Sequence, residues 1–210
     1  MIIKRHQVDY QEIDYSNLHL TPPCMAYMDS FRAAIADYRA YNVEDFGYPK
    51  VRTRAAAKAY IDKMDNMRRG LSVPRGFVPS SAFWLVDGRQ YLGEGHVRHF
   101  LNDNLKRFGG NIGYSIRPKF WGKGLGTRQV ALLLEEAKKL YIFRPIITCF
   151  EHNIASARII EKNGGMLVQK VNNKINGRNR LTRIYQVDLT NQIVEELTSL
   201  TNDSKYVKII

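Results

Sequence analysis

The stretch "IRPKFWGKGLGTRQVALLLEEAKKL", residues 116–140, limits the folds open to this chain more than any other segment. Three alternate glycines, Gly122, Gly124 and Gly126, stand directly before a segment with the spacing of an amphipathic helix. Its expected apolar face consists of Val130, Leu133, Leu134, Ala137 and Leu140. Glycines let the backbone turn tightly and approach a ligand, and the first N–H groups of a helix have no partner within it. The segment therefore predicts an anion site at a helix N-terminus.

Two familiar phosphate-binding loops do not fit this spacing. A P-loop needs a serine or threonine after its lysine, but Gly124 follows Lys123 here. A dinucleotide-binding turn needs G-x-G-x-x-G directly after its strand, but these glycines are spaced G-x-G-x-G and come several residues later. Lys119, Lys123 and Arg128 nevertheless add positive charge at the same helix mouth. We expect a phosphate site of another type.

The remaining periodicity predicts a single sheet with helices around it. Residues 26–69 have helical patterns that end at Gly70, whereas β-branched and alternating segments dominate from residue 80 onward. We expect strands at residues 82–87, 91–100, 109–116, 145–150, 166–171 and 180–189, a helix at 155–163, and a turn at 172–177. The predicted fold class is α/β (α+β): a single mixed, largely antiparallel twisted sheet flanked by helices.

The chain has a net charge of +12, and nearly all of the excess lies in one segment. Residues 71–190 carry 19 basic and 8 acidic residues, a net charge of +11, and they include the glycine loop. Such a field attracts a polyanion, either a nucleic acid or a phosphorylated cofactor. The basic residues are scattered rather than arranged in one stripe, so we do not expect nucleic acid.

Other sequence features bear on the compartment of the protein. No apolar run approaches the ~20 residues of a membrane span, and the N-terminus has no apolar core of a secretory signal. Cys24 and Cys149 are far apart and show no zinc-ligand spacing. We expect two reduced thiols in a cytoplasmic protein that needs no metal and contacts no membrane.

Two motifs carry a resemblance to a known family. "RPKFWGKGLGT" resembles motif A of the GNAT acyltransferases, and "CFEHNIASARIIEKNGG" resembles their second signature, in the same order and spacing. The branch of ribosomal-protein N-terminal acetyltransferases is the most similar. The resemblance implies one GNAT domain over residues 1–190, with a helical acceptor-side region at 1–70, an acetyl-CoA-binding core at 80–190, and a C-terminal tail at 191–210.

The resemblance also implies acetyl-CoA bound between the diverging strands "NIGYSI" and "PIITCF". Its pantetheine arm would bond the backbone near Ile116 and its pyrophosphate would lie on residues 121–127, which also explains the excess charge of this segment. The implied cofactor-binding residues are Ile116, Arg117, Trp121, Gly122, Lys123, Gly124, Leu125, Gly126, Thr127 and Asn153.

The chain departs from the family pattern at two functional positions. Trp121 replaces the usual glutamine or arginine, so backbone donors must hold the phosphates there. Ile160 stands where many members have a tyrosine that acts as general acid, and isoleucine cannot donate a proton. By resemblance Ser156 is the candidate acid beside the leaving sulfur, although a serine in a first helical turn also occurs without any function.

The general base is left open among three residues. Strand alternation puts Leu92, Glu94, His96 and Arg98 on one face, where Glu94 and His96 could remove a proton from the attacking amine. Glu151, just after the strand at 145–150, is a third candidate. Any of them could instead lie on an ordinary solvated surface.

The expected acceptor is a small-molecule primary amine or a peptide N-terminus. Asp37, Glu44 and Asp45, with the aromatic residues around them, suit a cationic amine, although an amphipathic helix with a polar outside explains them as well. Transfer to a hydroxyl and use of a longer acyl-CoA are the nearest enzymatic alternatives. A CoA-binding sensor without catalysis and a basic nucleic-acid-binding protein are alternatives of another class. A homodimer stays open.

Overall fold

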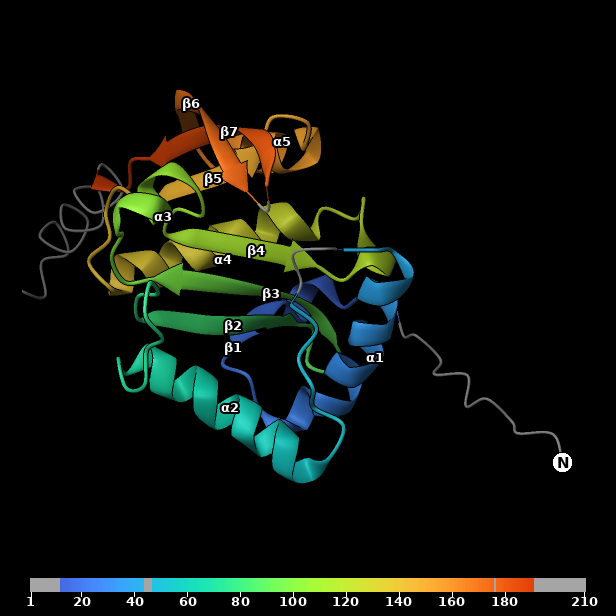
Figure 1. Ribbon diagram of the computed structural model, residues 1–210. Helices are drawn as coiled ribbons and strands as arrows, with labels where there is room; N and C mark the ends of the chain where they lie inside the picture. The colour runs from blue at the N-terminus through green and yellow to red at the C-terminus, as the bar shows by residue number, and fades with distance from the viewer. Residues whose placement is uncertain (1–11, 44–46, 176, 191–210) are drawn as a thin grey trace, which may run out of the picture.

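The computed structural model describes residues 12–43, 47–175 and 177–190, and one seven-stranded sheet forms its centre (Figure 1). The strand order is β1-β2-β3-β4-β5-β7-β6. Neighbouring strands are antiparallel except β4 and β5, which are parallel. The strands are β1 (His19–Thr21), β2 (Ser80–Val86), β3 (Tyr91–Arg98), β4 (Ile112–Ile116), β5 (Ile146–Phe150), β6 (Gly165–Ile175) and β7 (Arg178–Val187). The predicted mixed, largely antiparallel sheet is confirmed.

Helices lie before and between these strands. The α-helices of the described residues are α1 (Met28–Ala40), α2 (Arg54–Arg68), α3 (Asp103–Arg107), α4 (Leu125–Lys139) and α5 (Ile154–Lys162). Short 3-10 helices are η1 (Tyr15–Asn17), η2 (Met25–Tyr27) and η4 (Pro118–Phe120). The Thr53 hydroxyl accepts from the Ala56 N–H and so caps α2, and Gly70 ends that segment at φ +73°.

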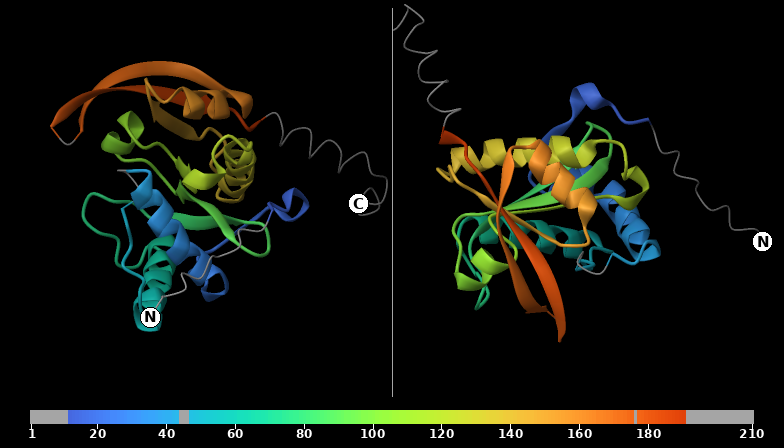
Figure 2. Two further views of the ribbon diagram at one scale, coloured as in Figure 1. Left: turned by 90° about the vertical axis from the view of Figure 1, so that its right-hand side faces the viewer. Right: turned by 90° about the horizontal axis from the view of Figure 1, so that it is seen from above.

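The sheet lies between two helical layers. On one face α4 and α5 bury Val130, Leu133 and Ala137 against Val97 and Ile112 of the sheet. On the other face, α1 and α2 cover a second core around the side chains of Phe31, Trp84 and Tyr91. The views in Figure 2 show α4 and α5 on one side of the sheet and α2 and α3 on the other. The α1 and α2 layer therefore covers β2 and β3, whereas α4 and α5 pack on the face of β3, β4 and β5.

The glycine segment forms the predicted amphipathic helix α4, with one exception. Val130, Leu133, Leu134 and Ala137 are buried as expected. Leu140 is 36% exposed, because the helix ends at Lys139 and Leu140 is its C-terminal cap. A Cβ at Gly95 would lie 2.5 Å from Leu133 Cδ1, so this glycine lets α4 pack closely on β3.

The C-terminal hairpin is longer than predicted. The sequence predicts a turn at residues 172–177, but Asn172–Ile175 continue β6 and pair with Arg178–Leu181 of β7. This part is a two-stranded ribbon of mostly polar residues, so it lacks the apolar alternation from which strands are predicted. The ribbon extends beyond the rest of the sheet on the side of α2 and α3 (Figure 2). The predicted C-terminal tail lies outside the described residues.

Candidate functional site

The two parallel strands β4 and β5 diverge directly after their single paired position, Ile112 with Ile147. Backbone hydrogen bonds join β4 to β3 on its other side. The backbone N–H of Arg98 donates to the carbonyl of Asn111 at 2.7 Å, and the backbone N–H of Arg117 donates to the carbonyl of Leu92 at 2.8 Å. Antiparallel pairing alternates, so the backbone N–H groups of Tyr114 and Ile116 point away from β3 and toward β5. The sequence predicts cofactor contacts at this edge.

Trp121 connects the glycine loop to the end of β4. Its indole N–H donates to the Ile116 carbonyl at 2.7 Å, and its ring packs edge-on against Tyr41 with centroids 5.7 Å apart. The side chain is therefore engaged with β4 and α1. Only the backbone of Trp121 is left for the predicted contact with a phosphate.

The three glycines of the loop serve two different purposes. Gly122 and Gly124 have φ of +77° and +76°, which favours glycine, and a Cβ at either would meet nothing within 4 Å. A Cβ at Gly126 would lie 2.6 Å from Ile159 Cδ1, so Gly126 permits close packing of α4 and α5. Gly124 is the N-cap of α4 and supplies no side-chain cap, so the first N–H groups of the helix point outward.

Two of the three cations predicted at this helix terminus, Lys119 and Lys123, lie against the same ring, that of Phe120. Burial, together with the positive charges of Arg117 and Lys123, lowers the pKa of Lys119 to about 7. The Nζ atoms of Lys119 and Lys123 lie 4.7 Å and 5.7 Å from the centroid of the Phe120 ring. An anion bound here would favour the charged form of Lys119.

The side chain of Arg117, a predicted cofactor residue, points into the protein instead. It is 1% exposed, and its Nε lies 2.5 Å from Oδ2 of Asp37. The ion pair ties α1 to η4, so any contact of Arg117 with a cofactor in this arrangement involves its backbone. The proposed attraction of Asp37 for a cationic amine is weakened for the same reason. Glu44 and Asp45 lie outside the described residues.

Ser156 and Tyr114 meet across the gap between β4 and α5. The Asn153 side chain caps α5 by accepting from the Ser156 N–H at 3.0 Å. The Ser156 hydroxyl lies 2.8 Å from the Tyr114 hydroxyl. Burial raises the pKa of Tyr114 to about 12, so its hydroxyl stays protonated at neutral pH. Nearby, burial also raises the pKa of the Cys149 thiol.

Sequence reasoning missed Tyr114, although its alternation with Ile116 was a usable signal. The Ile160 side chain is fully buried in the core beneath α5. Tyr114 thus supplies a hydroxyl near Ser156 from β4, whereas many family members would place one on α5.

Glu94 and His96 lie together on the opposite face of the sheet. Their carboxylate and imidazole are 3.9 Å apart, with 17% and 34% of the side chains exposed. Glu94 pairs with Ser115 of β4, whereas Tyr114 pairs with Gly95, so Glu94 and Tyr114 project from opposite faces. The negative charge of Glu94 contributes, after burial, to the raised pKa values of the neighbouring Tyr38, Tyr60 and Tyr91.

The prediction that Leu92 shares this face is wrong. The pairing of β2 with β3 shifts between Leu85 and Val86, and this bulge interrupts the alternation. Leu92 packs with Leu85 and Leu125 in a separate core cluster. Arg98 lies beyond the bulge and lines the same cavity as His96.

Glu151 is a poor candidate for the general base. Its carboxylate accepts two hydrogen bonds from Arg183, at 2.7 Å and 2.9 Å, and one from Lys170 at 3.1 Å. These contacts lower its pKa to about 2. A carboxylate with such a low proton affinity is a weak base, and Glu151 instead joins the end of β5 to β6 and β7.

Within the described ranges, no group of three or more His, Cys, Asp or Glu side chains could hold a metal ion. No helix among the described residues is long and apolar enough to cross a membrane.

A family model described as an acetyltransferase (GNAT) domain matches residues 17–166. No curated protein matches this chain. Among solved structures, RimL, a ribosomal L7/L12 alpha-N-protein acetyltransferase in complex with coenzyme A, has a TM-score of 0.61 at 16% identity, covering 83% of this chain and 96% of RimL. The microcin C7 self-immunity acetyltransferase MccE, in complex with acetyl-CoA and AMP, also has a TM-score of 0.61, at 19% identity, over 82% and 92% of the two chains.

An acetyltransferase from Salmonella typhimurium that modifies the N-terminal serine of L7/L12 has a TM-score of 0.58 at 14% identity, over 82% of this chain and 95% of that one. These structures share the fold of this chain. The family match confirms the predicted acetyl-CoA co-substrate. The matched residues include both motifs and end at the beginning of β6. This chain belongs to the GNAT acetyltransferase family.

Proposed function

We propose that this protein transfers the acetyl group of acetyl-CoA directly to a primary amine within a ternary complex. The observation that carries the proposal is the gap between β4 and β5, with the uncapped N-terminus of α4 at one end and the Tyr114–Ser156 pair beside it. The similar RimL structure was solved with coenzyme A and MccE with acetyl-CoA, which supports a cofactor at this place.

The backbone of the glycine loop would hold the pyrophosphate. The outward N–H groups of residues 125–127 and the positive end of the helix dipole attract an anion. Lys119 and Lys123 add charge beside them. Ile116 would offer its N–H to the thioester oxygen, because that group points into the gap.

In the transfer step the amine nitrogen attacks the thioester carbon, and the carbon–sulfur bond then breaks. The Ser156 hydroxyl donates its proton to the departing thiolate and takes up another from solvent, while the Tyr114 hydroxyl donates a hydrogen bond to Ser156 Oγ and orients it. The attacking amine loses its proton to Glu94 or His96, directly or through water. The acid and the base lie on opposite faces of the sheet, so donor and acceptor can approach from opposite sides.

A thiol-release assay with acetyl-CoA and a panel of primary amines tests this function. We expect saturable release of CoA that depends on an amine, with the intact mass of the protein unchanged after incubation with acetyl-CoA alone. Binding of acetyl-CoA without turnover of any amine would identify a CoA-binding sensor and contradict the proposal. An acetylated protein would contradict the direct transfer.

A further inference from the structure

Two cavities lie along the β6–β7 ribbon, and Phe108 of the larger and Arg180 of the smaller both lie against the Phe150 ring. The larger has a volume of about 710 Å³ and lies between the ribbon, α2, α3 and β3, with Asn173 and Ile175 in its wall. The smaller, of about 480 Å³, includes Arg178 and Arg180. Arg178 pairs with Ile175 and Arg180 pairs with Asn173, so the two cavities share one face of the ribbon. We call the combined space the hairpin cleft.

The hairpin cleft reaches a candidate base at one end and the start of α5 at the other. His96, which lies 3.9 Å from Glu94, lines the larger cavity. His152 lines the smaller cavity, one residue before Asn153, the cap of α5. A ligand in the hairpin cleft would therefore extend toward the candidate base from the α2 and α3 side, which is the face opposite Ser156 and Tyr114.

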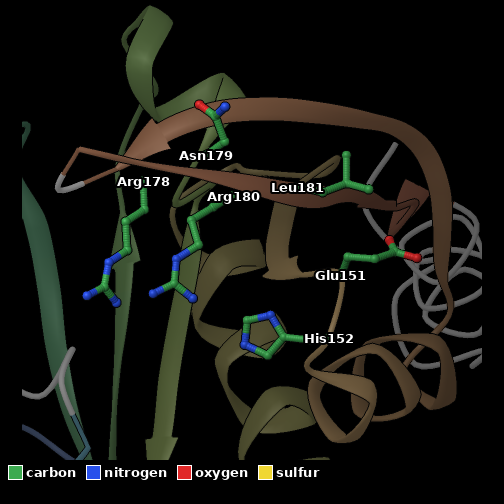
Figure 3. A pocket seen from close by; sticks show the side chains of 6 residues that line it. All are labelled: Glu151, His152, Arg178, Asn179, Arg180 and Leu181. Atoms are coloured by element: carbon green, nitrogen blue, oxygen red, sulfur yellow. The ribbon is translucent and has the colours of Figure 1, made fainter.

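The charged side chains of the hairpin cleft are almost all basic. Its cationic residues come from five different elements and are Lys63, Arg98, Arg107, Lys174, Arg178 and Arg180. Figure 3 shows the guanidinium groups of Arg178 and Arg180 side by side, on the side of His152. The one acidic lining residue is Glu151, whose carboxylate is already bound to Arg183 and Lys170.

These cations are not neutralised by the rest of the described structure. Within residues 12–43, 47–175 and 177–190, none of the six forms an ion pair. Arg98 is held in place by donating to the carbonyls of Gly109 and Gly110, and Arg180 lies over the Phe150 ring. Like charges repel when they gather in a concave site, so this arrangement favours an anionic ligand.

Resting on the proposed function, we infer that the acceptor is a primary amine whose own molecule carries carboxylate or phosphate groups. The amine approaches Glu94 and His96, while its anionic part lies among the cations of the hairpin cleft. A polyamine or another polycationic acceptor would be repelled. A cavity of this volume suits a small molecule or a few residues of a peptide N-terminus.

The experiment uses three tetrapeptide amides that share an N-terminal serine, followed by three acidic, three neutral or three basic residues. Aminoethyl phosphate represents a small phosphorylated amine, and spermidine represents a cationic one. Comparing the acidic peptide with aminoethyl phosphate shows whether the acceptor carries carboxylates or a phosphate. We expect the acidic peptide or aminoethyl phosphate to be acetylated with a KM at least tenfold below that of the basic peptide or spermidine.

The double variant Arg107→Gln/Arg178→Gln removes two exposed charges of the hairpin cleft. Exposed charge pairs contribute up to about 1 kcal/mol each, about fivefold, so we expect the KM of the anionic acceptor to rise about tenfold. The KM of the neutral peptide should not change. The control Lys139→Gln/Arg144→Gln removes the same charge at the opposite end of β5, and we expect it to leave both values unchanged.

Equal use of cationic and anionic acceptors would overturn the inference, and so would an unchanged KM in the double variant. If no amine is acetylated, a separate measurement tests whether the hairpin cleft binds anionic ligands. It is the calorimetric titration of the CoA-saturated protein with the acidic peptide and with aminoethyl phosphate. Binding that the double variant weakens would uphold the hairpin cleft while refuting the proposed transfer. If neither ligand binds, the inference itself is refuted. It is also refuted if the protein binds an oligonucleotide but neither of these two ligands.

Discussion

At the scale of single residues, the proposed mechanism assigns proton donation to Ser156 in contact with Tyr114, because Ile160 stands at the position of the usual acid. We expect Ser156→Ala to lower kcat about a hundredfold, as loss of a general acid does. Tyr114→Phe removes one hydrogen bond and should lower kcat about five- to tenfold. Neither change should alter the KM of acetyl-CoA by more than about twofold, because both act on the leaving sulfur.

Steady-state kinetics of the double variant Tyr114→Phe/Ser156→Ala separates positioning from simple packing. If Tyr114 acts through Ser156, the double variant is as slow as Ser156→Ala alone. Additive losses would show that Tyr114 affects the reaction by another route. An unchanged kcat in Tyr114→Phe would remove this residue from the mechanism.

We expect Lys119 to make cofactor binding depend on pH. Its pKa is lowered to about 7, so above pH 7 the free protein holds mostly the neutral amine. A pyrophosphate on the adjacent loop favours the ammonium and raises this pKa, so binding at pH 8 takes up a proton and the affinity falls as pH rises toward 9. Calorimetry of CoA binding in two buffers of different ionisation enthalpy measures this uptake. It should disappear in Lys119→Met; equal uptake in that variant would assign the proton to another group.

At the scale of elements, the ion pair of Arg117 with Asp37 fixes α1 against the segment that leads into the glycine loop. Asp37→Asn leaves a guanidinium that is 1% exposed without its carboxylate, and we expect a loss of about 3–5 kcal/mol in the free energy of unfolding. Asp29→Asn is the matched control, because it breaks a pair with Arg32 on the same helix whose carboxylate is 96% exposed. That change should cost less than about 1 kcal/mol in urea unfolding. Equal losses would show that the buried pair contributes no more than the exposed one.

The elements were predictable wherever a buried face repeats along the chain. The apolar spacing of α4 and the β-branched run of β5 predicted both correctly, because each buries one side against the core. The polar ribbon of Asn172–Ile175 was missed because it buries little.

The site was harder to predict. Tyr114 meets Ser156, and Glu151 meets Arg183, through contacts between strands and helices distant in sequence. No local pattern records such contacts.

At the scale of the whole molecule, the proposed reaction has its cofactor side and its acceptor side on opposite faces of the sheet. The glycine loop, Tyr114 and Ser156 belong to the side of α4 and α5, whereas Glu94, His96 and the hairpin cleft lie on the side of α2 and α3. The gap between β4 and β5 is where the two sides meet. The proposed reaction therefore requires acetyl-CoA to lie in the gap, with its pyrophosphate at the N-terminus of α4.

Calorimetric titration of acetyl-CoA into the wild type and two glycine variants tests this central claim most directly. Gly124→Asp puts a carboxylate at the N-terminus of α4, and Gly70→Asp puts one at a similar left-handed φ, +73°, at the end of α2. Both changes should cost about 1–2 kcal/mol in stability. We predict one-to-one micromolar binding to the wild type and Gly70→Asp, and none to folded Gly124→Asp. Unchanged affinity in Gly124→Asp would contradict the placement of the cofactor.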